Sequence, residues 1–218
     1  MALLECHMLS GANLLDAARL LSSPASLKIS NNRGRTPLMA AIGADCDLGQ
    51  ILEIVGAGSD WGAQDAKGMS AVALAMNKGG AGVARSIWLA HPDPARAARA
   101  VSDNGSTLAH IAAESNAADM LLAIAPHSDF SARDARGLTP LMSASSHSNG
   151  LACSAVALLA PWSDCLAVDP AGCDALMLAI ENAWREDWAE FSLIISELAP
   201  RSDLFSHDIL RLKWDMGA

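Results

Sequence analysis

The feature that most constrains this 218-residue chain is a segment that occurs five times around a glycine. The copies read NNRGRTPLMAAI from Asn31, DAKGMSAVALAM from Asp65, SDNGSTLAHIAA from Ser102, DARGLTPLMSAS from Asp134 and DPAGCDALMLAI from Asp169. Successive glycines are 34, 37, 32 and 35 residues apart. A period of about 20–50 residues indicates a repeat array, in which each unit buries its apolar face against its neighbours.

A second motif runs in phase with the first. It reads APHSDF from Ala125, APWSDC from Ala160 and APRSDL from Ala199, with a degraded copy GAGSDW from Gly56. The aspartates of three copies, Asp60, Asp129 and Asp164, each stand eight residues before a repeat glycine. Because the two motifs keep this phase through several copies, we interpret them as parts of one repeated unit.

The repeated residues predict a turn followed by two helices. Asp-x-x-Gly is typical of a tight turn, since glycine readily takes a positive φ. The threonine that follows suits a helix N-cap, with proline at the first helical position. We expect a short first helix such as 38–42 or 176–180, then a second such as 151–159 or 191–198. The Gly79-Gly80 pair predicts a turn between the two helices of its unit.

Composition agrees with an all-α fold and argues against an all-β fold and against a nucleic-acid-binding protein. There are 43 alanines and only nine aromatic residues, which favours helices over a β-sandwich or barrel. A net charge of −9 argues against broad nucleic-acid binding.

We find no signal peptide and no apolar run long enough for a membrane helix. Arginine outnumbers lysine 11 to 4, which, with the abundant alanine, suggests a GC-rich bacterial gene. An odd number of cysteines without C-x-x-C spacing predicts free, mostly buried thiols in a reducing compartment, at Cys6, Cys46, Cys153, Cys165 and Cys173.

Over about residues 24–208 the chain resembles the ankyrin repeat. Thr-Pro-Leu from Thr36 and from Thr139 matches that family's motif, and Thr107 and His110 stand where it has its threonine and histidine. The sequence also departs from the family pattern: serine replaces an alanine in the second motif, and HPDPARAARAV replaces the Ser-Asp expected before Gly105. The resemblance implies an all-α solenoid of stacked helix-turn-helix repeats that binds a partner protein.

The resemblance also implies one domain over residues 1–218. We expect an N-terminal capping helix pair within 1–30, a C-terminal cap at 205–218, and repeats at 31–64, 65–101, 102–133, 134–168 and 169–204. Members of the family bind partners through their concave face and hairpin tips, at positions that flank the glycine and end the first helix. Matching positions here are Asn32, Arg33, Arg35, Lys67, Met69, Asn77, Lys78, Asn104, Ser106, Glu114, Arg136, Leu138 and His147.

Three tryptophans are further candidates for partner contact. Trp162 follows a helix in an expected loop, and Trp184 and Trp188 lie in an insertion that lengthens the last repeat. Tryptophan is favoured in binding hot spots. The alternative is that these rings cover the core of the last repeat, as we expect Trp61 to pack in the core of its own.

Four of the tip residues are basic: Arg33, Arg35, Lys67 and Arg136. Their equivalent positions suggest a partner with an acidic or polar surface. Solvated turn charges without a function would produce the same pattern.

We find no motif for catalysis, a metal or a cofactor. None of the histidines has the spacing of a zinc helix, and both a P-loop and a nucleophile elbow are missing. We interpret Asp60, Asp129 and Asp164 as turn residues, and the resemblance implies that His110 bonds Thr107. The sequence therefore argues against an enzyme and predicts a cytoplasmic protein, monomeric alone, that binds neither nucleic acid nor a membrane.

Two more specific roles stay open within protein binding. One is an inhibitor or immunity-type regulator of a bacterial enzyme or toxin. The other is a bacterial effector that mimics an adaptor inside a host cell. The identity of the neighbouring genes would discriminate between them, because an adjacent toxin gene favours immunity.

Overall fold

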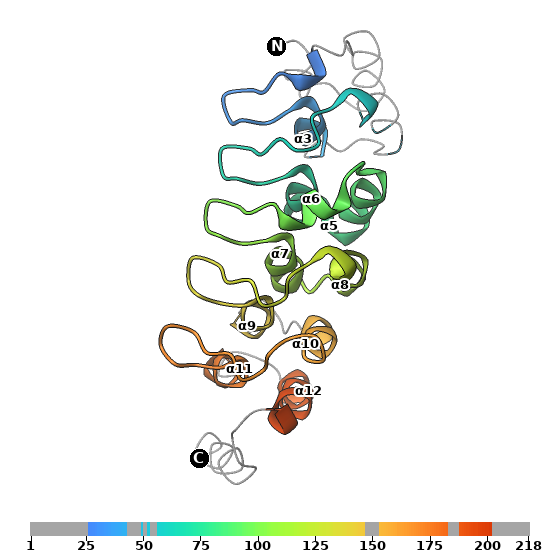
Figure 1. Ribbon diagram of the computed structural model, residues 1–218. Coiled ribbons are helices and arrows are strands. Elements are labelled where there is room, and N and C mark those ends of the chain that lie inside the picture. Colours follow the sequence, from blue (N-terminus) through green and yellow to red (C-terminus); the bar gives the residue numbers. More distant parts are fainter. Residues whose placement is uncertain are drawn as a thin grey trace. The chain divides into compact units, whose positions relative to one another are not determined.

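The computed structural model describes residues 26–42, 49, 52, 56–146, 153–182 and 188–201. Within these ranges every regular element is a helix, and sheet-like pairing is limited to an isolated antiparallel bridge between Val101 and Thr107. The all-helical class predicted above is thus confirmed (Figure 1). No helix in this part of the chain has the length and apolar character needed to cross a membrane.

The chain divides into two compact units. The first comprises residues up to 111 together with 122–128, and the second comprises 112–121 together with residues from 129 onward. Helices α7 (Leu108–Glu114) and α8 (Ala118–Ile124) therefore contribute to both units.

In the first unit, loops connect the 20-residue helix α5 to several shorter helices. Helix α3 packs against α5 and η2, and α6 packs against η4. The bounds of these elements are η2 Ser26–Lys28, α3 Pro37–Ala41, η3 Gly56–Gly58, α5 Ala71–Ala90, α6 Pro94–Arg99 and η4 Ala125–His127.

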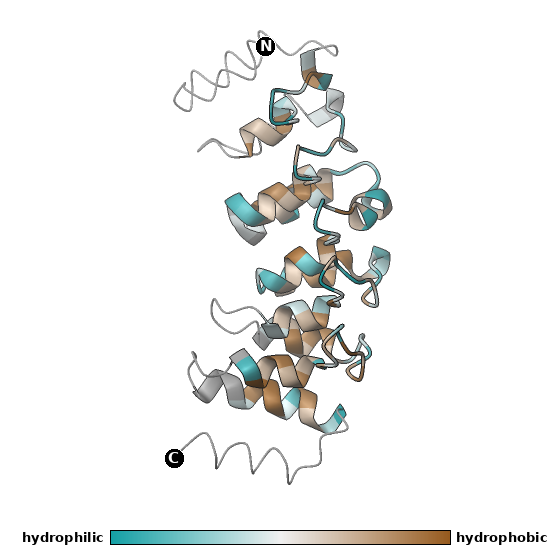
Figure 2. Ribbon diagram, turned by 90° about the vertical axis from the view of Figure 1, so that its left-hand side faces the viewer, coloured by the Kyte–Doolittle hydropathy of each residue, from teal (hydrophilic) through white to brown (hydrophobic). Residues whose placement is uncertain are grey.

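In the second unit, α9 packs against α10 and α11, and α12 packs against α10, α11 and η6. Figure 2 shows apolar residues on these packed helices and hydrophilic residues along much of the loop backbone. The bounds are α9 Pro140–Ser146, α10 Cys153–Leu159, α11 Ala175–Asn182, α12 Trp188–Leu198 and η6 Ala199–Arg201.

Side-chain caps begin the first helix of four repeats. The hydroxyl oxygens of Thr36 and Thr139 accept from the backbone N–H three residues on, at 3.4 and 3.3 Å, and proline follows each as predicted. Where the Thr-Pro pair is missing, Ser70 and Asp174 make the same bond at 3.3 and 2.7 Å. An N-cap needs only a short side-chain acceptor, so these departures from the motif leave the helix start intact.

Alanine fills the sides of the helices that face one another. In α9 and α11, which pack together, Ala144, Ala175 and Ala179 are buried beside the fully buried Leu141 and Leu176. Small side chains let helix axes approach closely, so the high alanine content reflects thin helices packed side by side.

Gly80 interrupts the long helix α5, as predicted from the glycine pair. Its φ of 77° and ψ of 174° lie outside the helical region, so the element consists of two helical stretches joined at a kink. The expected N-terminal helix pair and the C-terminal cap at 205–218 lie outside the described residues.

Candidate interaction surface

Five turns with the same geometry lie where the sequence repeats its glycine. We call them tip turns; they begin at Asn31, Asp65, Ser102, Asp134 and Asp169. In each, the first N–H donates to the carbonyl oxygen of the fifth residue at 2.9–3.0 Å. The glycine N–H donates to the carbonyl oxygen of the first residue at 2.8–3.0 Å, and the glycine φ is 70–85°.

The first side chain holds the tip turn from inside. In four of the five turns its Oδ1 accepts from the N–H groups of the third and fifth residues, at 2.8–3.1 Å. Asparagine and aspartate suit this position because their oxygen reaches the backbone two and four residues ahead. In these four turns the backbone of the tip is therefore held independently of the side chains between its first residue and its glycine, whereas in the Ser102 turn Oδ1 of Asn104 accepts from the N–H of Ser106 at 3.3 Å.

Those intervening side chains are the ones that face solvent. Both residues between the first residue and the glycine are exposed in all five tip turns. The exposed residues are Asn32, Arg33, Ala66, Lys67, Asp103, Asn104, Ala135, Arg136, Pro170 and Ala171.

Neighbouring tip turns of the first unit are joined by backbone hydrogen bonds. In the first unit the N–H of Ala66 donates to the carbonyl oxygen of Arg33 at 2.8 Å, and that of Asp103 donates to Lys67 at 3.1 Å. The turns at Asn31, Asp65 and Ser102 consequently lie side by side (Figure 1).

Two side chains that the sequence reasoning missed add to these links. Gln64 donates from Nε2 to the carbonyl oxygens of Gly68 and Val101, at 2.9 and 3.0 Å. In the second unit, Arg133 donates to Gly137 and Val168 at 2.6 and 2.7 Å. Gln64 and Arg133 each directly precede the first residue of a tip turn. Each side chain reaches the residue just before the next tip turn, which is Val101 or Val168. The sequence signal that could have identified these two residues is a long polar side chain directly before the first residue of a tip turn.

The four basic residues of the tips differ in their surroundings. The Nε of Arg35 lies 3.3 Å from Oδ2 of Asp65, and its side chain is only 19% exposed. Arg136 pairs with both Asp134 and Glu114, at 2.8 Å each. Arg33 and Lys67 are exposed and have no ion pair within the described residues. Two of the four charges are thus neutralised within the chain.

The surroundings of Asp134 in its tip turn lower the pKa of its carboxylate. Burial alone would raise its pKa, but the N–H of Leu138 and the guanidinium of Arg136 outweigh burial and hold the pKa below its ordinary value. A lowered folded-state pKa stabilises the fold above the unfolded pKa, and this stabilisation is lost as pH falls through the folded pKa.

We therefore expect Asp134→Asn to lower the free energy of unfolding by about 1 kcal/mol at pH 7. The difference from the unmodified protein should shrink as pH falls below about 4, where the carboxylate becomes protonated. Urea unfolding at pH 7, 5 and 3 measures it. Asp169→Asn is the matched control, because Asp169 makes the same two backbone bonds but pairs with no arginine in the described residues. An equal loss and pH dependence in both variants would contradict the role of Arg136.

The remaining sequence-predicted positions fall into three groups. Asn77, Lys78 and Asn104 are exposed, and Met69 is half-buried. Ser106 and Leu138 are only 2% and 6% exposed, so neither offers a surface to a partner and we leave both out of the interface. His147, Trp184 and the side chain of Trp188 lie outside the described residues.

Trp162 has a packing role and an open face. Its ring stacks on Phe130 with centroids 5.6 Å apart, yet it remains 43% exposed. The equivalent residue of the preceding copy, His127, likewise packs on Trp88 with centroids 6.1 Å apart. In both copies, the side chain at the third position of the second motif thus packs on an aromatic ring. This packing explains why the apolar ring of Trp162 lies in a loop.

The carboxylates that could suggest catalysis are turn residues, as predicted. Oδ1 of Asp60, Asp129 and Asp164 accepts from the N–H two residues ahead, at 3.0, 2.9 and 3.0 Å. His110 is fully buried, and its Nδ1 lies 2.9 Å from the hydroxyl of Thr107. No cluster of potential metal ligands occurs among the residues that the structure describes.

Comparison with known proteins found no matching family model and no matching curated protein. Function is therefore inferred from the repeated turns and the groups that they expose.

Proposed function

We propose that this chain is a non-catalytic protein-interaction module, an α-solenoid of the ankyrin type that binds a partner protein through its tip turns and the adjacent helix ends. The observation that carries the proposal is the equivalence of the five tip turns. Each has the same backbone bonds and exposes the same two positions. The motifs that resemble the ankyrin repeat supply these turns and the helix starts beside them.

This construction suits recognition for a physical reason. The tip backbone is held by its own hydrogen bonds and, in the first unit, by bonds to the neighbouring turn, so little conformational entropy is lost when a partner binds. In the four turns that begin with Asn or Asp, the exposed side chains do not participate in those backbone bonds. They can therefore differ between turns, as Lys67 and Ala171 do, without altering the scaffold.

Charge indicates the kind of partner surface. Arg33 and Lys67 occupy the same position of adjacent tip turns and are not paired within the described residues. Acidic groups of a partner would form ion pairs with Arg33 and Lys67 without breaking an ion pair inside this chain. Arg35 and Arg136 would have to exchange a carboxylate of this chain for one of the partner, which offsets much of the gain.

The test is a charge reversal with a matched control. Arg33→Glu/Lys67→Glu should weaken binding at least about 10-fold at low salt, mainly through slower association. Lys28→Glu/Arg85→Glu makes the same change in net charge at exposed sites outside the tip turns. A partner is first captured with the unmodified protein from the organism that encodes it, and affinities are then measured by surface plasmon resonance. An unchanged dissociation constant, or an equal loss in both variants, would refute the proposal.

A further inference from the structure

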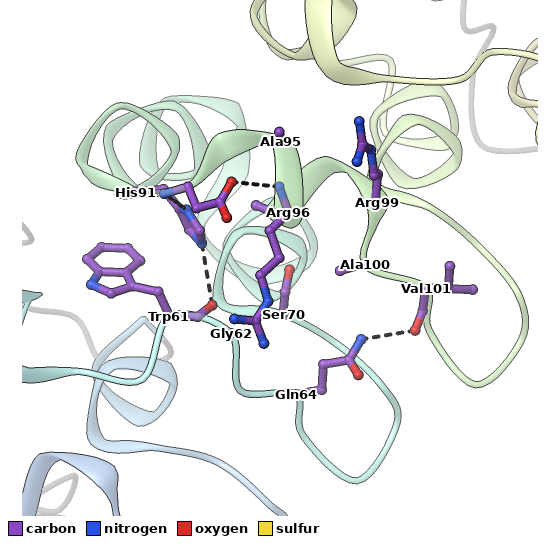
Figure 3. A pocket seen from close by; sticks show the side chains of 12 residues that line it. Trp61, Gly62, Gln64, Ser70, His91, Ala95, Arg96, Arg99, Ala100 and Val101 are labelled. Carbon is purple, nitrogen blue, oxygen red and sulfur yellow. Dashed lines mark hydrogen bonds between the residues drawn. The ribbon is translucent and has the colours of Figure 1, made fainter.

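A groove of about 640 Å³ lies in the first unit, and its lining includes none of the exposed tip residues. Three stretches line it: the loop from Trp61 to Gln64, Ser70 at the start of α5, and the segment from His91 to Val101 (Figure 3). The last stretch is HPDPARAARAV, where the sequence departs from its own repeat pattern. The groove therefore arises from the irregular part of the repeat array.

The departure creates helix α6 and directs two arginines to the groove. Oδ1 of Asp93 accepts from the N–H of Arg96 at 3.0 Å and caps the helix. Ala97 and Ala98 are buried. Arg96 and Arg99, three residues apart and so on one side of the helix, both line the groove.

One wall is an aromatic pair in a fixed geometry. Trp61, predicted to pack in the core, is instead half-buried; its Nε1 donates to the carbonyl oxygen of Gly56 at 2.8 Å. The ring of His91 meets the indole nearly edge-on, with centroids 5.2 Å apart.

The hydrogen bonds of His91 make it a neutral part of this wall. Its Nδ1 accepts from the N–H of Asp93 at 3.0 Å, which leaves Nε2 to donate toward the carbonyl oxygen of Trp61 at 3.4 Å. Burial lowers the pKa of His91, so the imidazole is neutral at pH 7. The positive charge of the groove therefore comes from the arginines.

Arg96 is the cation best placed for a ligand. Its guanidinium lies against Gly62, where a Cβ would come within 2.7 Å of Cζ (Figure 3). The equivalent positions of two other copies hold Ser131 and Leu166, so a glycine stands where the guanidinium needs space. Neither Arg96 nor Arg99 has an ion pair within the described residues. Arg99 lies at the edge of the groove, its guanidinium turned away from that of Arg96.

We propose that this groove binds an organic carboxylate. Arg96 holds the carboxylate through two parallel N–H···O bonds, and the apolar body of the ligand lies against the indole of Trp61. The groove has the volume of sites for small organic ligands, about 300–1,000 Å³. Its lining contains two arginines against one aspartate, an excess of positive charge in a chain of net charge −9. The ligand is either a free small acid or an acidic side chain of a bound protein, and the site does not depend on the tip turns.

Two pairs of probes test whether the ligand needs a carboxylate and whether that carboxylate comes from a free acid or from an acidic side chain. The first is 4-phenylbutyrate with its uncharged amide, and the second is the peptide acetyl-Gly-Phe-Glu-Gly-amide with its glutamine counterpart. Binding to the full chain is followed by NMR, through the backbone amides of Gly62 and His91 and the Nε–H of Arg96. We expect saturable shifts with at least one acid and binding about 10-fold weaker or more for its uncharged counterpart. Shifts with phenylbutyrate identify a free acid as sufficient, whereas shifts with the peptide alone identify an acidic side chain.

Three variants locate the site. Arg96→Gln should weaken binding of the acid about 10-fold, and Gly62→Ala should also weaken it, because the new methyl displaces the guanidinium. Arg85→Gln removes an exposed guanidinium outside the groove and should leave affinity within about twofold. Thermal unfolding checks that each variant folds. The absence of saturable shifts, equal binding of acid and amide, or equal effects of the Arg96 and Arg85 variants would overturn the proposal.

Discussion

Gly68→Ala is expected to lower the free energy of unfolding of the first unit by about 3 kcal/mol, whereas Gly172→Ala is expected to cost about 1 kcal/mol. Both glycines close a tip turn with a positive φ, 70° and 85°, which costs an L-residue a similar strain. They differ in what a new Cβ would meet. At Gly68 it would come within 2.7 Å of the backbone nitrogen of Asp103, and at Gly172 nothing lies within 4 Å.

The clash at Gly68 also falls on a bond between neighbouring turns. The N–H of Asp103 donates to the carbonyl oxygen of Lys67, so displacing this backbone breaks the link as well. Urea unfolding monitored by circular dichroism measures the two losses. Hydrogen exchange of the backbone amides assigns each loss to its unit, because two compact units need not unfold together. Equal losses at the two glycines would show that the neighbouring turn contributes nothing.

His110→Ala is the second change for which we expect a large effect, about 3 kcal/mol of unfolding free energy. His110 is fully buried, and its Nδ1 lies 3.2 Å from the N–H of Thr107 and 2.9 Å from the hydroxyl of Thr107. Alanine leaves a cavity and removes the acceptor for both groups at the start of α7.

His127→Ala is the matched control and should cost about 1 kcal/mol. His127 is half-buried and only packs its ring at an angle against Trp88. Thermal unfolding of the two variants at pH 7 gives the comparison. If His110→Ala cost no more than His127→Ala, the buried bonds to Thr107 would not stabilise the helix start.

The turn and helix-start predictions succeeded because their causes are local. The carboxylate of Asp65 reaches N–H groups two and four residues ahead, and Thr36 caps through an N–H three residues ahead. Such bonds depend on a few consecutive residues, which a repeated motif makes visible. The same reasoning assigned Asp60, Asp129 and Asp164 to turns.

The electrostatic predictions were less complete because charge pairing joins distant residues. Arg35 meets an aspartate 30 positions away, and Arg136 meets a glutamate 22 positions away. Four basic tip residues looked alike in the sequence, but only Arg33 and Lys67 remain unpaired among the described residues. Burial was also not visible in the sequence: Ser106 and Leu138 belong to tip turns by position, yet both are buried.

The sequence by itself determined the all-helical class, the positions of the five tip turns and the residues that start the helices. These follow from φ preferences and hydrogen bonds within about five residues. Only the tertiary structure decided which tip charges are available and that Trp61, Arg96 and Val101 line one groove. Those outcomes depend on segments about 30 residues apart in the chain meeting in space, because ion pairs and cavities form wherever packing brings groups together.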